Sequence, residues 1–336
     1  MIMFRADGNS SIGSGHIMRC LSIADALKKK SKNSIFIVSD ESMKNTITSR
    51  GYECIVLGTD YKNMESELDS LPLLIKDYSC ETVVVDSYYV TRNYLKSLRE
   101  LAKTVYIDDV FSFAYPCDIL INYNIYADKA LYEDLYAKEG MTAPQMLLGP
   151  SYAPLREIYS DIRPKEIHED VNEVLVLTGG SDPLHIAVSL LKEIPDTPHF
   201  TFVVGLLSAD YAEITELASK KKNVTIQGPV ENLKGLMEKA DVAISAAGST
   251  QYELCAMGVP CVNYAFADNQ LPGAKGFSSR NLMLYSGDFR EKSNPSGEIV
   301  RNLSTLISDC NMRSDFSANM QKVVDGNGAL KIADTL

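Results

Sequence analysis

Residues 4–19 read FRADGNSSIGSGHIMR and join a short apolar run, Met1 to Phe4, to an amphipathic segment. The apolar run has the composition of a buried strand. One face of a following helix would carry Ile17, Leu21, Ala24 and Leu27. Between the two, the chain turns polar and rich in glycine. The stretch predicts a strand, an open loop and the N-terminus of a helix.

The glycine-rich loop is suited to holding an anion. Gly13 and Gly15 let the backbone around Ser14 turn sharply and come close to a ligand. The first N–H groups of the helix are unpaired and carry partial positive charge, which favours an anionic group. His16 lies at this end and Arg19 follows three residues later, so both can share one helix face. The positive end of the helix and the Arg19 guanidinium both disfavour a charged His16 ring. We therefore expect a neutral imidazole that can accept a proton from water. The alternative is a histidine that only caps a tight turn.

Length and composition indicate two globular domains. The chain has 336 residues, of which 45% are hydrophobic and 23% are charged, so each half can bury its own core. A net charge of −11 argues against a nucleic-acid partner. An anionic ligand would have to be bound by local donors, because the overall field is repulsive.

Cysteine and histidine usage predicts a cytoplasmic protein without a metal or cofactor. The seven cysteines form no Cys-x-x-Cys pair and are typical of a reducing compartment. No apolar run approaches the length of a membrane span, and the N-terminus lacks a basic leader, so we expect no membrane insertion. Four unclustered histidines argue against zinc, and no Asp-x-Asp pair offers a metal–diphosphate clamp.

Continuous β-branched runs alternate with helical patterns in the first half. The clearest runs are residues 82–86 and 104–109, which predict a parallel sheet covered on both faces. Open α/β sheets bind ligands at the carboxyl ends of their strands, so Asp86 and Tyr88 are site candidates. Asp108 and Asp109 are candidates too, although they could cap the following helices instead.

A further predicted strand, residues 118–122, brings Asn122 and Asn124 to the same sheet edge. Their side-chain amides could bind sugar substituents or could simply close the turn.

A junction is predicted where Gly149, Pro150 and Pro154 precede a charged stretch, residues 161–170. We expect an N-terminal domain over residues 1–150, a linker over 151–171, a second α/β domain over 172–310 and a helical tail over 311–336.

The second domain begins with a strand, residues 174–177, and a glycine turn made of Gly179, Gly180, Ser181 and Asp182. Asp182 can act as N-cap with Pro183 at the first helical position. The turn could bind a second anion, or helix initiation alone could explain it.

Another strand, residues 242–245, runs into small residues that would leave a concave helix start. Ser249 and Thr250 offer hydroxyl and N–H donors there. Glu253 could accept two ribose hydroxyls, or could form a capping box with Thr250. A strand over residues 259–264 leads to the loop Asp268-Asn269-Gln270.

The motifs together resemble the UDP-2,4-diacetamido-2,4,6-trideoxy-β-L-altropyranose hydrolases of pseudaminic acid biosynthesis. The similarity begins with residues 4–7 and 12–21 and spans nearly the whole chain. It continues through Val85–Tyr88, Asp118–Asn124, Gly149–Tyr152 with Leu155–Glu157, Gly179–Asp182, Ser245–Glu253 and Asn269–Gln270.

The resemblance implies a GT-B-like α/β fold with two doubly wound parallel-sheet domains facing an interdomain cleft, UDP being held mainly by the second. It implies metal-independent, cofactor-free hydrolysis of a UDP-sugar with inversion at the anomeric carbon, and His16 as the base. UDP would be bound by Gly179 to Asp182, Ser249, Thr250, Glu253, Asn269 and Gln270, and the sugar would lie towards Tyr88, Asn122 and Asn124.

This chemistry agrees with the residues. UDP is a stable anionic leaving group, so the general acid of an ordinary glycosidase is not required. A base for water and fixed donors for the diphosphate are sufficient, and Arg19 could assist the second task. Two alternatives stay open: an inverting GT-B glycosyltransferase with a UDP-sugar donor, and a non-catalytic UDP-sugar binding protein.

Overall fold

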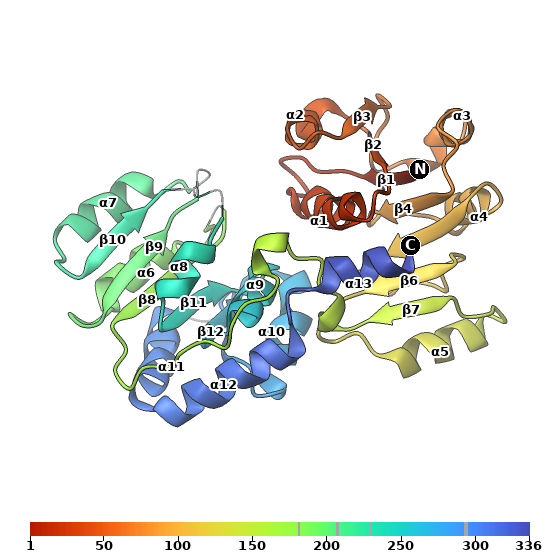
Figure 1. Cartoon of the computed structure of the whole chain (residues 1–336). Coiled ribbons are helices and arrows are strands. Elements are labelled where there is room, and N and C mark those ends of the chain that lie inside the picture. Colours follow the sequence, from red (N-terminus) through yellow and green to blue (C-terminus); the bar gives the residue numbers. More distant parts are fainter. Residues whose placement is uncertain (181, 206–207, 229, 231, 292–294) are drawn as a thin grey trace. The chain divides into compact units, whose positions relative to one another are not determined.

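The computed structural model describes residues 1–336 except 181, 206–207, 229, 231 and 292–294. The chain forms two compact units. The first contains Met1–Glu157 together with Gly326–Leu336, and the second contains Ile158–Asp325. Each unit is built on a parallel sheet with helices packed on it (Figure 1).

The sheet of the first unit has the strand order β3-β2-β1-β4-β5-β6-β7. The strands are β1 (Ile2–Ala6), β2 (Ser34–Val38), β3 (Glu53–Val56), β4 (Thr82–Asp86), β5 (Lys103–Ile107), β6 (Ile119–Asn122) and β7 (Gln145–Leu148). All five residues of β1 and of β4 are buried, as expected of central strands covered on both faces.

Most helices of this unit lie between strands of its sheet, and the last one comes from the C-terminal segment of the chain. They are α1 (Gly15–Lys29), α2 (Lys44–Ser49), α3 (Leu71–Asp77), α4 (Arg92–Arg99), α5 (Lys129–Lys138) and α13 (Gly328–Thr335). Short 3₁₀ turns occupy η1 (Glu41–Met43), η2 (Met64–Glu67) and η3 (Pro150–Tyr152). A fourth, η4 (Glu157–Tyr159), spans the chain position at which the second unit begins. Strand order reverses between β1 and β4, which is where open α/β sheets place their ligands.

The second unit repeats this plan with the strand order β10-β9-β8-β11-β12-β13. Its strands are β8 (Glu173–Leu177), β9 (His199–Val203), β10 (Val224–Gln227), β11 (Val242–Ala246), β12 (Cys261–Ala265) and β13 (Leu284–Asp288). Its helices are α6 (Ile186–Glu193), α7 (Tyr211–Ser219), α8 (Lys234–Lys239), α9 (Thr250–Met257), η5 (Asp268–Gln270), α10 (Leu271–Ser279), α11 (Pro295–Ser308) and α12 (Cys310–Val323). Here the order reverses between β8 and β11.

The expected tail over residues 311–336 is divided between the units. Helix α12 belongs to the second unit and packs on α9, whereas α13 belongs to the first and packs on α1. Gly328 lets α13 approach closely, because a Cβ there would lie 2.1 Å from the carbonyl oxygen of Ala153. Two strands, β7 and β13, lie where the sequence pattern indicated none.

None of the helices in the described part of the chain is both long and apolar enough to span a lipid bilayer.

Candidate active site

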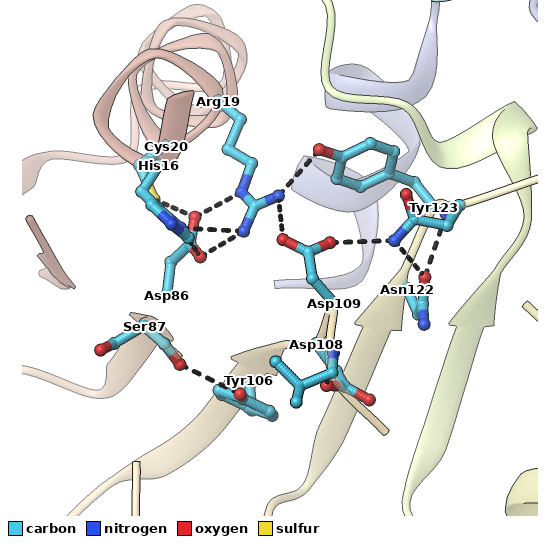
Figure 2. A network of polar contacts seen from close by, with 12 residues as sticks. His16, Arg19, Cys20, Asp86, Ser87, Tyr106, Asp108, Asp109, Asn122 and Tyr123 are labelled. Atoms are coloured by element: carbon cyan, nitrogen blue, oxygen red, sulfur yellow. Dashed lines mark hydrogen bonds and ion pairs between the residues drawn. The ribbon is translucent and has the colours of Figure 1, made fainter. Parts of the chain in front are cut away.

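His16 and Asp86 meet at the reversal point of the first sheet. His16 is the second residue of α1, Asp86 ends β4, and His16 Nδ1 lies 2.6 Å from Asp86 Oδ1 (Figure 2). Both side chains are buried. Burial alone would raise the pKa of Asp86, but Arg19 and His16 outweigh it and hold that pKa well below its usual range. An ionised carboxylate only accepts hydrogen bonds, so the contact with Asp86 requires a proton on Nδ1. Arg19 Nη2, which also donates to Asp86 Oδ1, lies 3.0 Å from the same nitrogen.

Arg19 is fully engaged by protein groups. Its Nε and Nη2 donate to the two oxygens of Asp86, both at 2.5 Å. Its Nη1 donates to the Tyr123 hydroxyl at 2.8 Å and pairs with Asp109 Oδ2 at 2.7 Å. Burial opposes the charged form, but Asp109 and Asp86 raise the pKa of Arg19 above its ordinary value. The sequence suggested that Arg19 could help to bind the diphosphate. In the structure the guanidinium is not free to do so, because protein groups already occupy it.

The carboxylates around Arg19 outnumber its charge. Arg19 pairs with both Asp86 and Asp109, so these three groups carry one net negative charge.

Tyr88 covers one side of the histidine. The edge of one ring meets the face of the other, with centroids 4.6 Å apart at 78°. Tyr88 remains 44% exposed, and burial together with Asp109 raises its pKa to about 12. The phenol is therefore neutral at physiological pH and can donate a hydrogen bond.

The motif that precedes the helix anchors the loop to the sheet. Arg5 is completely buried in β1 and donates to Asp7 at 2.6 Å, and it also pairs with Glu67. Asp7 in turn accepts the Ser39 N–H at 2.7 Å. A short antiparallel bridge then joins Asn9 to Gly13, the latter at φ +73°.

The loop returns the chain to α1 without a side-chain cap. Ser14 is the N-cap residue but makes no side-chain cap hydrogen bond, and Gly15 begins the helix. The loop residues Gly13, Ser14 and Gly15 are all exposed.

Asp108 has a structural role that differs from helix capping, because β5 leads to β6 without an intervening helix. Its buried carboxylate accepts the N–H groups of Val110 and Phe111 at 2.8 and 3.0 Å and the hydroxyls of Tyr115 and Tyr132. Asp109 instead lies beside Arg19, as described above.

Asn122 and Asn124 support the turn alternative. Asn122 Oδ1 accepts the N–H and the side-chain amide of Asn124, at 3.0 and 2.9 Å, and its own amide donates to Tyr132. Asn124 also donates to Asp109 at 2.9 Å. Both side chains thus close the turn and steady Asp109.

The predicted start of α6 is wrong. The helix begins at Ile186, not at Pro183, because Asp182 and His185 adopt left-handed backbone with φ of +44° and +55°. The Asp182 carboxylate accepts the N–H groups of Ile186 and Ala187 at 3.0 and 2.8 Å. This carboxylate occupies the N-terminus of α6, as the helix-initiation alternative expects of Asp182.

The glycine turn lies close to the next strand connection. Gly179 and Gly180 are exposed, and a Cβ on Gly205 would lie 2.2 Å from the Gly180 carbonyl oxygen. Ser181 lies outside the described residues.

The start of α9 has no side-chain cap from its N-cap residue. Ser249 is the N-cap and makes no side-chain cap hydrogen bond, and Thr250 is the first helical residue, so the expected capping-box alternative does not form. Glu253 accepts the hydroxyl of the buried Tyr159 at 3.1 Å. Of the predicted loop beyond β12, Asn269 is exposed, while Gln270 accepts the N–H of Phe266 at 2.9 Å.

The second unit thus gathers three predicted segments at one sheet edge. β8, β11 and β12 are neighbours, and their carboxyl ends carry the glycine turn, the start of α9 and the loop over η5. Among the residues that the structure describes, no group of three or more His, Cys, Asp or Glu side chains could hold a metal ion.

Two contributors escaped sequence analysis. The Tyr123 hydroxyl accepts a hydrogen bond from Arg19 in the first unit, and Tyr159 contacts Glu253 in the second. Their positions after a strand or in an irregular linker carry no pattern that distinguishes them from ordinary turn residues.

Comparisons with known proteins agree with this architecture. No protein-family model matches the chain. It is 23% identical to the spore coat polysaccharide biosynthesis protein SpsG of Bacillus subtilis, over 98% of this chain and 96% of that protein. It is 27% identical to the UDP-2,4-diacetamido-2,4,6-trideoxy-beta-L-altropyranose hydrolase of Campylobacter jejuni, over 74% of this chain and 85% of that protein. The resemblance drawn from the motifs is thereby confirmed.

Among solved structures, MurG of Acinetobacter baumannii has a similar fold. The TM-score is 0.73 at 14% identity, covering 99% of this chain and 98% of that chain. The predicted GT-B class, with two parallel-sheet α/β domains, is confirmed.

Proposed function

We propose that this relative of the Campylobacter jejuni hydrolase cleaves a UDP-linked 2,4-diacetamido-2,4,6-trideoxy hexose into UDP and the free sugar. The contact between His16 Nδ1 and Asp86, at 2.6 Å, is the observation that carries the proposal. With the proton on Nδ1, Nε2 has a lone pair that can accept a proton, and an ionised carboxylate holds the ring in place. This is the arrangement of a histidine base. Among the described residues, no group donates to Nε2. A role in pseudaminic acid biosynthesis is part of this proposal.

The reaction is a single displacement. A water molecule attacks the anomeric carbon while His16 Nε2 takes its proton, and the bond from that carbon to the UDP oxygen breaks with its electron pair going to UDP. One displacement inverts the anomeric centre. Asp86 stabilises the imidazolium, and Arg19 holds Asp86 in place through two hydrogen bonds.

The second unit supplies the nucleotide site in this proposal. The start of α9, with Ser249 and Thr250, suits the diphosphate because its N-cap residue, Ser249, makes no side-chain cap hydrogen bond. Glu253 suits the ribose, since a carboxylate can accept both of its hydroxyls. α6 is unsuited to the diphosphate because Asp182 already fills its N-terminus.

Turnover without an acceptor tests the proposal. The purified chain is incubated with the UDP-sugar in buffer alone, and UDP and free sugar are quantified. We expect equal amounts of both. Release of UDP only after an acceptor alcohol is added would indicate a glycosyltransferase, and binding of UDP without release of sugar would indicate a binding protein.

A further inference from the structure

Exposed apolar side chains follow two strands that carry residues of the candidate site. Tyr88, Val110 and Phe111 are 44%, 46% and 40% exposed, and they follow the carboxyl ends of the neighbouring strands β4 and β5. Tyr88 packs on the His16 ring. Val110 and Phe111 come directly after Asp109, which pairs with Arg19 at 2.7 Å. The turn that carries these apolar residues is therefore joined to the polar network through Asp109.

The turn that presents Val110 and Phe111 is unusually well held. Phe111 has φ +55°, a left-handed conformation that bulky residues rarely adopt. The Asp108 carboxylate, completely buried, accepts both of their N–H groups as well as the hydroxyls of Tyr115 and Tyr132. Strained backbone that its surroundings over-determine is typical of ligand-binding segments. A buried carboxylate with four donors thus holds the turn that carries two half-exposed apolar side chains, and the Phe111 ring also meets the Tyr132 ring edge to face with centroids 4.7 Å apart.

We propose that Val110 and Phe111 determine specificity by contacting methyl groups of the sugar. This inference rests on the proposed function. A 2,4-diacetamido-2,4,6-trideoxy hexose carries methyl groups on two acetamido substituents and at carbon 6. A fully hydroxylated hexose would instead place hydroxyls against an apolar surface that offers them no hydrogen bond. The turn over residues 108–111 consequently favours the deoxygenated, N-acetylated sugar.

Two substitutions test the surface without disturbing the turn. Phe111→Asn removes the ring but keeps a residue that tolerates left-handed backbone, and Val110→Thr exchanges a methyl for a hydroxyl at constant shape. Leu101→Asn is the matched control, because Leu101 is 47% exposed but precedes β5 at its opposite end. Thermal unfolding of each variant checks the fold, and Val110→Thr keeps the test valid if Phe111→Asn does not fold.

The readout is selectivity. We compare kcat/KM for the UDP-diacetamido-trideoxy hexose with that for UDP-N-acetylglucosamine, or their inhibition constants if the second is not cleaved. The preference for the diacetamido-trideoxy sugar should fall about tenfold in each variant, which is the range expected for one apolar contact. The inhibition constant of UDP alone should stay unchanged in these variants, and the selectivity of Leu101→Asn should equal that of the wild type.

The outcomes separate this inference from the proposed function. Cleavage by the wild-type protein with unchanged selectivity in both variants would overturn only the role of Val110 and Phe111. Failure of the wild-type protein to release UDP from any UDP-sugar would overturn the proposed function and this inference with it.

Discussion

His16 Nδ1 lies 2.6 Å from Asp86 Oδ1, although the two residues are 70 positions apart in the chain. The contact joins the first helical turn after β1 to the end of β4, and these two strands are adjacent only because the order of the sheet reverses there. The contact fixes the orientation of the His16 ring, and the hydrolytic mechanism proposed above depends on it.

Replacing His16 by asparagine should abolish most turnover while UDP still binds. The side chain would lose its proton-accepting ring, and a positioned base contributes about 10²–10⁴-fold to such a reaction. The proposed nucleotide residues belong to the second unit, so the affinity for UDP should not change. Steady-state kinetics and calorimetric UDP titration check both statements. Undiminished kcat would remove His16 from the mechanism.

Asp86→Asn should lower kcat by about 10²-fold or more with little change in UDP affinity. An amide can donate to Nδ1, which would place the ring proton on Nε2 and remove the lone pair that accepts the proton of water. Asp25→Asn is a suitable control, since Asp25 also lies on α1 and pairs with Arg50 away from this network. Equal kinetics of the two variants would contradict the role of Asp86.

The Asp86 carboxylate should also make the free energy of unfolding depend on pH under acidic conditions. Its pKa is well below the ordinary value in the folded chain, because Arg19 and His16 outweigh the effect of burial. A carboxyl group whose pKa is lower in the folded than in the unfolded chain stabilises the fold at pH values above its unfolded pKa of about 3.9. This stabilisation is lost as the pH falls from there towards the folded pKa.

Urea denaturation from about pH 5 downwards tests this dependence. The difference in unfolding free energy between the wild type and Asp86→Asn should narrow as the solution becomes more acidic. A difference that stays constant over the acid range would show that the carboxylate is not preferentially ionised in the folded state.

Local signals in the sequence selected His16, Arg19 and Asp86 as candidates but did not indicate which side chains would contact them. His16 and Arg19 follow a glycine loop, and Asp86 ends a β-branched run, so each could be selected from its neighbours alone. Arg19 was expected to help an anion, because nothing in the sequence indicates that Asp86 and Asp109 neutralise it. Pairing across strands depends on the order of the sheet, which a single sequence does not encode locally.

Asp182 illustrates the same limit at shorter range. An aspartate at this position correctly predicted a helix cap. The left-handed backbone at residues 182 and 185 places the start of α6 at Ile186, where the sequence predicted Pro183. The strands β7 and β13 were missed for a related reason: the first is short and ends beside a Gly-Pro pair, and the second contains Ser286, Gly287 and Asp288, which weaken the strand pattern.

Glu253→Ala should raise KM and weaken UDP binding, with a smaller effect on kcat. The carboxylate is proposed to bind the ribose, and a lost hydrogen bond to a charged group costs about 1.5–3 kcal/mol, or roughly 10–100-fold in affinity. Tyr159→Phe removes only the hydroxyl that donates to Glu253, so its effect should be in the same direction and smaller. Unchanged UDP affinity in Glu253→Ala would leave Glu253 with a purely structural role.

Hydrolysis in ¹⁸O water tests the central claim most directly. The wild-type protein and His16→Asn are incubated with the UDP-diacetamido-trideoxy hexose, and mass spectrometry locates the label while NMR identifies the first anomer formed. We predict that the label enters the sugar, that the anomeric configuration is inverted and that His16→Asn forms almost no product. Label in UDP would mean cleavage of a phosphorus–oxygen bond and would contradict attack of water at the anomeric carbon.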